Sequence, residues 1–294
     1  MVAPACSTCD TLLDRPTAGP VCEACWSAVA HFTPPICGAC GDPLPAGHLA
    51  ASSAASATAA LSEDAAWVSD ACARCRHAPS LVARSRAIGD YAGTLRAIIH
   101  ALKYDKRCSI APRLSALMRA CGGDVVRGVD AAVPVPLHWK RKWQRGFNQA
   151  ALLASGLGVA VWPALQRLRA TSPQVDLPAE ARRVNVKNAF AIARRRWPWQ
   201  VSWRARLKGR VVLLVDDVST TASTLEACAK VLLEAGVREV RALTAARVVG
   251  PPKGERTTQR SASSRRTASA TSCATASGGC SPRTRTQPGP RAWR

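Results

Sequence analysis

The sequence predicts an α/β protein with a parallel sheet, preceded by a small cysteine-rich module and followed by a disordered basic tail. Four Cys-x-x-Cys pairs lie within residues 1–80 and indicate the module. Continuous apolar runs alternate with helical apolar periodicity in residues 81–250, a pattern typical of a parallel sheet with crossover helices. Residues 251–294 carry nine Lys and Arg among Ser, Thr, Gly and Pro without apolar periodicity, which predicts the tail.

The positive charge of the chain is concentrated in its middle segment. The formal net charge is +22, from 41 Lys and Arg against 19 Asp and Glu. Residues 1–80 contribute −4, residues 81–250 contribute +18 and the tail contributes +8. A solubilising extension explains the tail at least as well as a nucleic-acid arm, whereas +18 within a folded domain favours an acidic partner such as nucleic acid.

No apolar stretch is long enough for a membrane helix, which needs about 20 apolar residues. The best candidate, residues 149–166, is interrupted by Ser155, Gly156, Gly158 and Pro163. The first residues also lack the basic start and apolar core of a signal peptide. The sequence therefore predicts a cytoplasmic protein without membrane insertion.

The four cysteine pairs favour structural Zn²⁺. Two residues between thiols let one tight turn aim both sulfurs at one ion, and two such turns complete a tetrahedral site. Disulfides need an oxidising compartment, which the missing signal peptide argues against, and four repeated pairs are more than one redox motif requires. Pairing in chain order predicts one site from Cys6, Cys9, Cys22 and Cys25 and another from Cys37, Cys40, Cys72 and Cys75. The spacing leaves a crossed pairing open.

In the body, two helices are predicted first, followed by a buried strand. Four apolar residues share one face of the first helix, and another four share one face of the second. These sets are Leu95, Ile98, Ile99 and Leu102, and Leu114, Leu117, Met118 and Cys121. The run 131–136 is apolar throughout and bounded by breakers, so it predicts a strand buried on both faces.

A strand, a helix and another strand follow near the end of the body. The strands are predicted at 211–215 and 240–246. The helix between them buries Leu225, Cys228, Ala229 and Leu232, is predicted to end at Gly236 and gains an i,i+4 pair between Glu226 and Lys230. This order makes a βαβ unit, and hence a parallel sheet.

The residues between the strand at 211–215 and its helix are the most informative for function. Two acids, Asp216 and Asp217, end the strand, and a run of small and hydroxyl residues, 218–224, leads into the helix. Ligands bind at the carboxyl ends of parallel strands, and helix N-termini attract phosphate. The carboxylates can accept hydrogen bonds from ribose hydroxyls or help to hold Mg²⁺. A Walker-B strand of a nucleotide-binding protein is one alternative, but the sequence contains no G-x-x-x-x-G-K-[ST] motif to accompany it. The other alternative, that an acid caps a turn or helix, would explain one of the two acids but not both.

This segment resembles the 5-phosphoribosyl-1-pyrophosphate (PRPP) motif of type I phosphoribosyltransferases. Over residues 5–247 the whole layout resembles the ComF family, competence-associated proteins with an N-terminal double zinc ribbon and a phosphoribosyltransferase-like domain. The similarity rests on the Cys pairs, Asp90-Tyr91, Lys103-Tyr104, the segments 133–137 and 145–149, Arg167, Arg169, Thr171, Gln174, Arg182, Asn185 and Ala189-Phe190. The resemblance implies a type I phosphoribosyltransferase-like fold for the body.

The resemblance also implies a binding site for Mg-PRPP or another phosphorylated ribose. Asp216 and Asp217 would contact the ribose, and Lys103 would stabilise the departing pyrophosphate. The 5′-phosphate would lie in the loop formed by Ser219, Thr220, Thr221, Ala222, Ser223 and Thr224. The family usually has Gly at the position of Ala222, and a left-handed Ala costs about 1–2 kcal/mol, which puts phosphate affinity in doubt.

Basic residues interleaved with tryptophans predict a surface for single-stranded DNA. Basic side chains neutralise phosphates and aromatic rings stack on unpaired bases. The candidates are Arg141, Lys142, Arg145, Arg182 and Arg183, near Trp139, Trp143, Trp197, Trp199 and Trp203. The alternative is a solvated basic loop whose tryptophans pack on the body. The family's link to DNA uptake favours the first interpretation and implies a competence helicase or DNA-processing protein as a partner.

Two functions therefore compete. One is an accessory protein for DNA uptake whose phosphoribosyl pocket serves as a sensor or scaffold. The other is an active Mg²⁺-dependent phosphoribosyltransferase that acts on a nitrogenous acceptor. The intact Asp216–Asp217 pair favours the enzyme, whereas Ala222, the charge of the body and the absence of an identifiable acceptor pocket in the sequence favour the accessory protein.

Overall fold

A computed structural model of the chain describes residues 4–45, 68–69, 71–137, 143, 146–168, 189–194 and 201–249. All of them belong to one unit, Met1–Gly250. The predicted tail, 251–294, lies outside the described residues. Among the described residues, no helix is long and apolar enough to cross a membrane.

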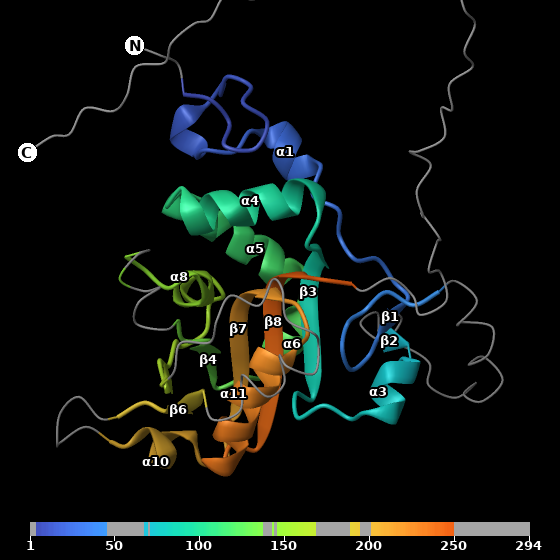
Figure 1. Ribbon diagram of the computed structural model, residues 1–294, viewed down its shortest axis with the longest axis vertical. Coiled ribbons are helices and arrows are strands. Elements are labelled where there is room, and N and C mark those ends of the chain that lie inside the picture. Colours follow the sequence, from blue (N-terminus) through green and yellow to red (C-terminus); the bar gives the residue numbers. More distant parts are fainter. Residues whose placement is uncertain are drawn as a thin grey trace, which may run out of the picture. The chain divides into compact units, whose positions relative to one another are not determined.

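Four parallel strands form the central sheet, which confirms the predicted fold class (Figure 1). Their order in the sheet is β3, β8, β7, β4, and every pair of neighbours is parallel. Their bounds are β3 Arg84–Asp90, β4 Ala131–Pro134, β7 Val211–Ser219 and β8 Glu239–Arg247. All four carboxyl ends therefore lie at one edge, where ligands bind in such sheets.

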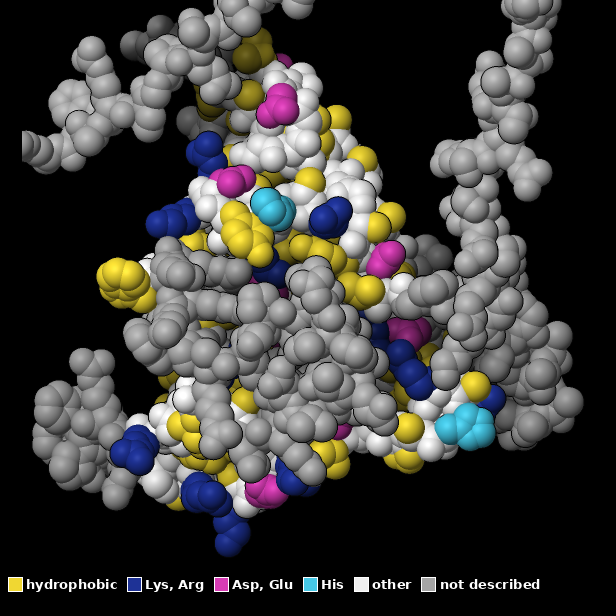
Figure 2. Space-filling model, in the orientation of Figure 1, with side chains coloured by type: hydrophobic (Ala, Val, Ile, Leu, Met, Phe, Trp, Pro, Cys, Tyr) yellow, Lys and Arg dark blue, Asp and Glu magenta, His cyan; other side chains and the backbone are white. Residues whose placement is uncertain are grey.

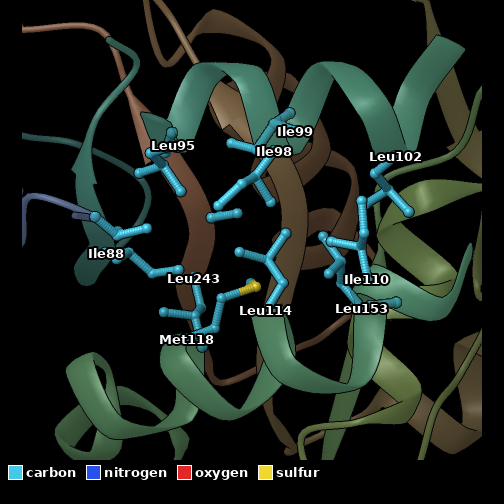
Figure 3. Packing of buried hydrophobic residues seen from close by; sticks show 14 of the residues in the cluster. Ile88, Leu95, Ile98, Ile99, Leu102, Ile110, Leu114, Met118, Leu153 and Leu243 are labelled. Carbon is cyan, nitrogen blue, oxygen red and sulfur yellow. The ribbon is translucent and has the colours of Figure 1, made fainter. Parts of the chain in front are cut away.

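Both faces of the sheet are buried, because alternate residues of β7 enter different cores. Leu213 and Val215 pack in one cluster with α4 (Gly93–Tyr104), α5 (Ala111–Cys121) and α8 (Gln149–Ser155) (Figure 3). Val212 and Leu214 pack in the other cluster with α11 (Ser223–Glu234). The three predicted helical faces are confirmed, and each contributes its predicted apolar residues to these clusters.

Shorter elements complete the body. The helical segments are η3 (Cys108–Ile110), α6 (Gly123–Val126) and α10 (Trp203–Leu207). A separate antiparallel pair, β5 (Leu165–Arg167) and β6 (Phe190–Ile192), supplies Leu165 and Phe190 to the cluster under α11.

Two strand bounds and one ion pair expected from the sequence need correction. The first predicted strand ends at Pro134 rather than Pro136, and β7 continues through Ser219, so that both acids belong to the strand. The ion pair predicted between Glu226 and Lys230 is wrong, because the Glu226 carboxylate accepts hydrogen bonds from Ser80 Oγ and the backbone N–H of Leu81. Lys230 instead lies 3.9 Å from Glu234.

The cysteine-rich module has two small parts. The first contains η1 (Pro16–Ala18) and α1 (Glu23–Ser27), and the second contains β1 (Ile36–Cys37), β2 (Val68–Ser69) and α3 (Ala73–His77). Trp26 and Val29 of the first part belong to the same hydrophobic cluster as α4 and α5. The module is therefore packed on the body.

Candidate functional site

The two carboxylates lie at the carboxyl end of β7, as predicted. Asp217 is buried, and its Oδ1 is 3.1 Å from Nζ of Lys103, which comes from the last turn of α4. Asp216 lies opposite Thr244 of β8, and its Oδ1 accepts a 2.8 Å hydrogen bond from the backbone N–H of Asp217. The structure thus brings together Asp216, Asp217 and Lys103.

Burial gives Asp216 an unusual protonation behaviour. Desolvation raises the pKa of its carboxyl to about 8, and the neighbouring charge of Asp217 acts in the same direction. The hydrogen bond from the Asp217 N–H and the charge of Lys103 oppose that shift. The pKa of Asp216 is thus raised, whereas Asp217 pairs with Lys103, so the two acids are not equivalent.

The predicted loop residues divide among three elements: Ser219 ends β7, Thr220, Thr221 and Ala222 form the connection, and Ser223 and Thr224 begin α11, a helix of 12 residues. Ser219, Thr220, Ala222 and Thr224 line a small pocket together with Asp216. Thr221 Oγ1 and Ser223 Oγ are 2.8 Å apart, and the buried Oγ of Ser219 has no hydrogen-bond partner among the described residues. A buried hydroxyl without a partner is costly, so a ligand oxygen in this pocket would satisfy it.

Ala222 adopts the left-handed conformation that glycine usually supplies. It precedes α11 with φ 58°, and its carbonyl accepts the backbone N–H of Glu226 at 2.9 Å. The loop therefore has the geometry that the missing glycine would provide, at the cost of strain in an alanine.

The eight predicted zinc ligands form two clusters, in chain-order pairing. Within each cluster all four sulfurs lie within 4.8 Å of one another. Measured Sγ–Sγ distances are 3.9 Å for Cys6–Cys25, 3.7 Å for Cys9–Cys22 and 3.8 Å for Cys40–Cys72. A tetrahedron with Zn–S bonds of about 2.3 Å has edges of about 3.8 Å, whereas a disulfide bond is about 2.05 Å long. The residues present fit zinc, and the crossed pairing is excluded.

Backbone donors support the thiolates of both clusters. The N–H of Cys22 lies 3.3 Å from Cys6 Sγ, and the N–H of Cys72 lies 3.2 Å from Cys37 Sγ. Burial alone raises the pKa of Cys6, but backbone N–H donors, led by that of Cys22, lower it to about 6. Thiolates are the form that binds zinc, and these N–H donors stabilise it at Cys6 and Cys37, whereas burial raises the pKa of Cys25 and Cys75.

The second cluster is attached to the edge of the sheet that carries the site. Arg247, the last residue of β8, lies beside Ser219 of β7 and is 5% exposed. Its Nη1 donates to the Cys40 carbonyl at 2.6 Å, and its Nε is 2.6 Å from Asp42 Oδ1. Gly41 has φ 73°, and a Cβ there would lie 2.6 Å from the Ser85 carbonyl oxygen. The sequence analysis did not identify Arg247 as a site residue. The one feature that could have pointed to it is its position as a basic residue at the end of a buried strand.

Of the predicted DNA-binding surface, the structure describes only two tryptophans, Trp143 and Trp203. Arg141, Lys142, Arg145, Arg182 and Arg183 lie outside the described residues. Trp143 is 85% exposed, as a base-stacking residue would be. Trp203 instead packs on the body, with its ring 6.4 Å from that of Trp162 and the Arg206 guanidinium over both rings. For Trp203 the packing alternative is correct.

Comparisons with known proteins match both halves of this architecture. Residues 1–55 match the double zinc ribbon domain, and residues 145–271 match the phosphoribosyl transferase domain. DNA utilization protein YhgH of Escherichia coli O157:H7 is 33% identical over 234 residues, 75% of this chain and 87% of that protein. The chain belongs to the ComF family. Competence protein F of Haemophilus influenzae is 30% identical over 235 residues, with the same coverage of each chain.

The double zinc ribbon match covers only the first half of the second zinc cluster. The double zinc ribbon match ends at residue 55, before Cys72 and Cys75. The structure nevertheless places both thiols with Cys37 and Cys40. Cys72 and Cys75 lie beyond the matched residues, and the sulfur geometry assigns them to this cluster.

Proposed function

We propose that this ComF-family protein binds PRPP, or another phosphorylated ribose, at the β7–α11 loop and binds single-stranded DNA during DNA uptake or use. The observation that carries the first half is the juxtaposition of Lys103, Asp217 and the loop at one sheet edge. The second half rests on relatives named for DNA utilization and competence, and on the charge of +18 in residues 81–250.

Each part of a phosphorylated ribose has a matching group at this edge. The N-terminus of α11 and the hydroxyls of Ser219 and Thr224 suit the 5′-phosphate. Asp216 and Asp217 suit the ribose hydroxyls as hydrogen-bond acceptors, and the ammonium of Lys103 suits a pyrophosphate. Mg²⁺ accompanying PRPP would neutralise part of the pyrophosphate charge.

Cytoplasmic action is part of the proposal. The eight module thiols form two tetrahedral sets instead of disulfides, as expected where thiols are kept reduced. The same proposal includes DNA contacts by the predicted basic residues near Trp143. It also includes a competence helicase or DNA-processing protein as partner.

An active Mg²⁺-dependent phosphoribosyltransferase is the second candidate. The Lys103–Asp217 pair beside Asp216 favours it, since transfer from PRPP develops positive charge at carbon 1 while pyrophosphate leaves. Release of pyrophosphate from Mg-PRPP in the presence of nucleobases, and its loss in an Asp217→Asn variant, would establish this activity.

Calorimetric titration of Mg-PRPP tests the site assignment. The Asp216→Asn, Asp217→Asn double variant should bind at least about 10-fold more weakly, because charged hydrogen bonds contribute about 1.5–3 kcal/mol each. Asp130→Asn is the matched control, because Asp130 caps the opposite end of β7 through the N–H of Val211 at 2.8 Å. Equal binding by the double variant and the wild type would show that the site is assigned wrongly.

A further inference from the structure

The exposed side of α4 carries Arg96, His100 and Tyr104, and the less exposed Tyr91 and Lys103 lie between them and the carboxylate site. We call this surface the α4 face and define it by Tyr91, Arg96, His100, Lys103 and Tyr104. In the region where Figure 1 places α4, Figure 2 shows a histidine, Lys and Arg side chains and hydrophobic side chains together on the described surface.

Two rings of the α4 face form an exposed stack. His100 and Tyr104 are one helical turn apart, with ring centroids 4.4 Å apart and planes tilted by 39°. Tyr104 is 56% exposed and His100 is also exposed. The His100 ring packs against the Tyr104 ring and limits its movement, so the tyrosine is held in place for a stacking base.

These rings do not serve the core. The opposite side of α4 fills that role with Leu95, Ile98, Ile99 and Leu102, all buried (Figure 3). The exposed ring of Tyr104 is therefore accessible to a ligand at the surface.

The charges around the stack are mainly positive. Residues 91–107 contain four basic side chains and one acid, Asp105. Arg96, Lys106 and Arg107 are exposed, and the Arg96 guanidinium lies 6.0 Å from the centre of the Tyr91 ring. Flat rings for bases beside cations for phosphates are the pattern of a surface for single-stranded nucleic acid.

The stack adjoins the phosphate loop through the chain itself. Lys103, the residue before Tyr104, reaches Asp217 at 3.1 Å and lies 5.7 Å from the Tyr91 ring centre. Lys103 thus links the helix that carries the stack to the carboxyl end of β7.

We propose that the α4 face, together with Lys106 and Arg107 just after the helix, is a single-stranded DNA site in which Tyr104, packed on His100, stacks on a base and Arg96, Lys106 and Arg107 contact phosphates. This inference rests on the DNA half of the proposed function and gives it described residues. It also places the DNA next to the loop proposed for phosphorylated ribose.

Fluorescence anisotropy with the full chain tests the stacking. The probes are an oligothymidylate of about 12 nucleotides and an abasic oligonucleotide of equal length, within the span of one single-strand module. Tyr104→Ala should lower oligothymidylate affinity by about 5- to 100-fold, whereas Tyr104→Phe, which keeps the ring, should stay within about twofold of the wild type. Neither variant should change the affinity for the abasic probe. Unchanged oligothymidylate affinity in Tyr104→Ala, or an equal loss for the abasic probe, would overturn the inference.

Salt dependence tests the phosphate contacts. Arg96→Ala should reduce the slope of log affinity against log salt by about 0.7, the contribution of one contact to a single strand. Arg15→Ala, an exposed arginine of the first ribbon, is the matched control and should leave the slope unchanged. A slope unchanged by Arg96→Ala would remove Arg96 from the site. If the wild type itself fails to bind the oligothymidylate at low salt, the DNA half of the proposed function fails as well.

Discussion

Ala222 is a residue whose type and backbone conformation disagree. Its φ of 58° lies in the left-handed region, where alanine costs about 1–2 kcal/mol and glycine costs nothing. Glycine also loses more entropy on folding, by about 0.4–1 kcal/mol. Ala222→Gly should therefore raise the free energy of unfolding by about 0.5–1 kcal/mol, measured by urea denaturation.

The control for this prediction has the opposite sign. Ala227 lies inside α11 in right-handed helical conformation, so Ala227→Gly should lower the free energy of unfolding by about 1 kcal/mol. A loss of stability in Ala222→Gly comparable to that in Ala227→Gly would show that the left-handed geometry carries no strain.

Asp216 should make stability fall with rising pH. The pKa of its carboxyl is raised to about 8 in the folded protein from an ordinary 3.8, so the folded state holds the proton more tightly than the unfolded state. Its favourable contribution is complete below about pH 4 and is lost as the pH rises through 8. Asp216→Asn should therefore gain stability relative to the wild type between pH 4 and pH 8, by about 1.4 kcal/mol for each pH unit over which only the unfolded state is ionised.

Denaturation at several pH values measures this difference, and Asp130→Asn is the contrasting variant. The N–H of Val211 chiefly lowers the pKa of Asp130, and Arg210 adds to the effect. The contribution of Asp130 is therefore present above its ordinary pKa and lost in acid. A stability difference between Asp216→Asn and the wild type that does not vary with pH would contradict the account of Asp216.

At the scale of elements, Arg247 joins β8 to the second zinc ribbon. Its guanidinium contacts the Cys40 carbonyl and the Asp42 carboxylate. The side chains of Arg247 and Asp42 are both largely buried. Arg247→Met should cost about 2–3 kcal/mol, because Asp42 loses one of its two cationic partners. The variant should also release zinc to a chelator faster, measured with a zinc-sensitive dye.

An ion pair on the first ribbon supplies the control for Arg247→Met. Arg113 pairs with Glu23 in an exposed setting, so Arg113→Met should cost no more than about 1 kcal/mol. Equal effects of the two substitutions would show that Arg247 does not hold the ribbon.

The elements predictable from the sequence were those whose apolar pattern is local. The faces of α4, α5 and α11 and the apolar starts of β4, β7 and β8 follow from periodicity alone. β3 was missed because it contains Arg84, Ser85 and Arg86. Arg86 is buried through contacts with the Gly38 carbonyl and Asp124, partners far away in the sequence.

The parts of the candidate site that could be predicted are also those that depend on local sequence. Asp216, Asp217 and the loop follow from one continuous segment, and the zinc ligands follow from their spacing. The closeness of Lys103 to Asp217 was expected only from the family resemblance. The pKa of Asp216 and the role of Arg247 depend on packing between elements, which no local pattern displays.

At the scale of the whole molecule, the charge and the site lie in the same part of the chain. Residues 81–250 carry +18 and contain β7, the loop and the α4 face, whereas the zinc module is mildly acidic. Arg247 and the packing of Trp26 hold that module against the body that carries the site. The protein thus combines a zinc ribbon module with a body for which binding of ribose phosphate and of DNA at neighbouring sites is proposed.

The measurement that tests this account most directly is separate titration of Mg-PRPP and of single-stranded DNA into the full chain at low and moderate salt. We expect both ligands to bind, with DNA affinity falling steeply as salt increases and PRPP affinity changing much less. Salt-sensitive DNA binding without PRPP binding would contradict the proposed ribose-phosphate site. PRPP binding without DNA binding at either salt concentration would contradict the proposed role in handling DNA.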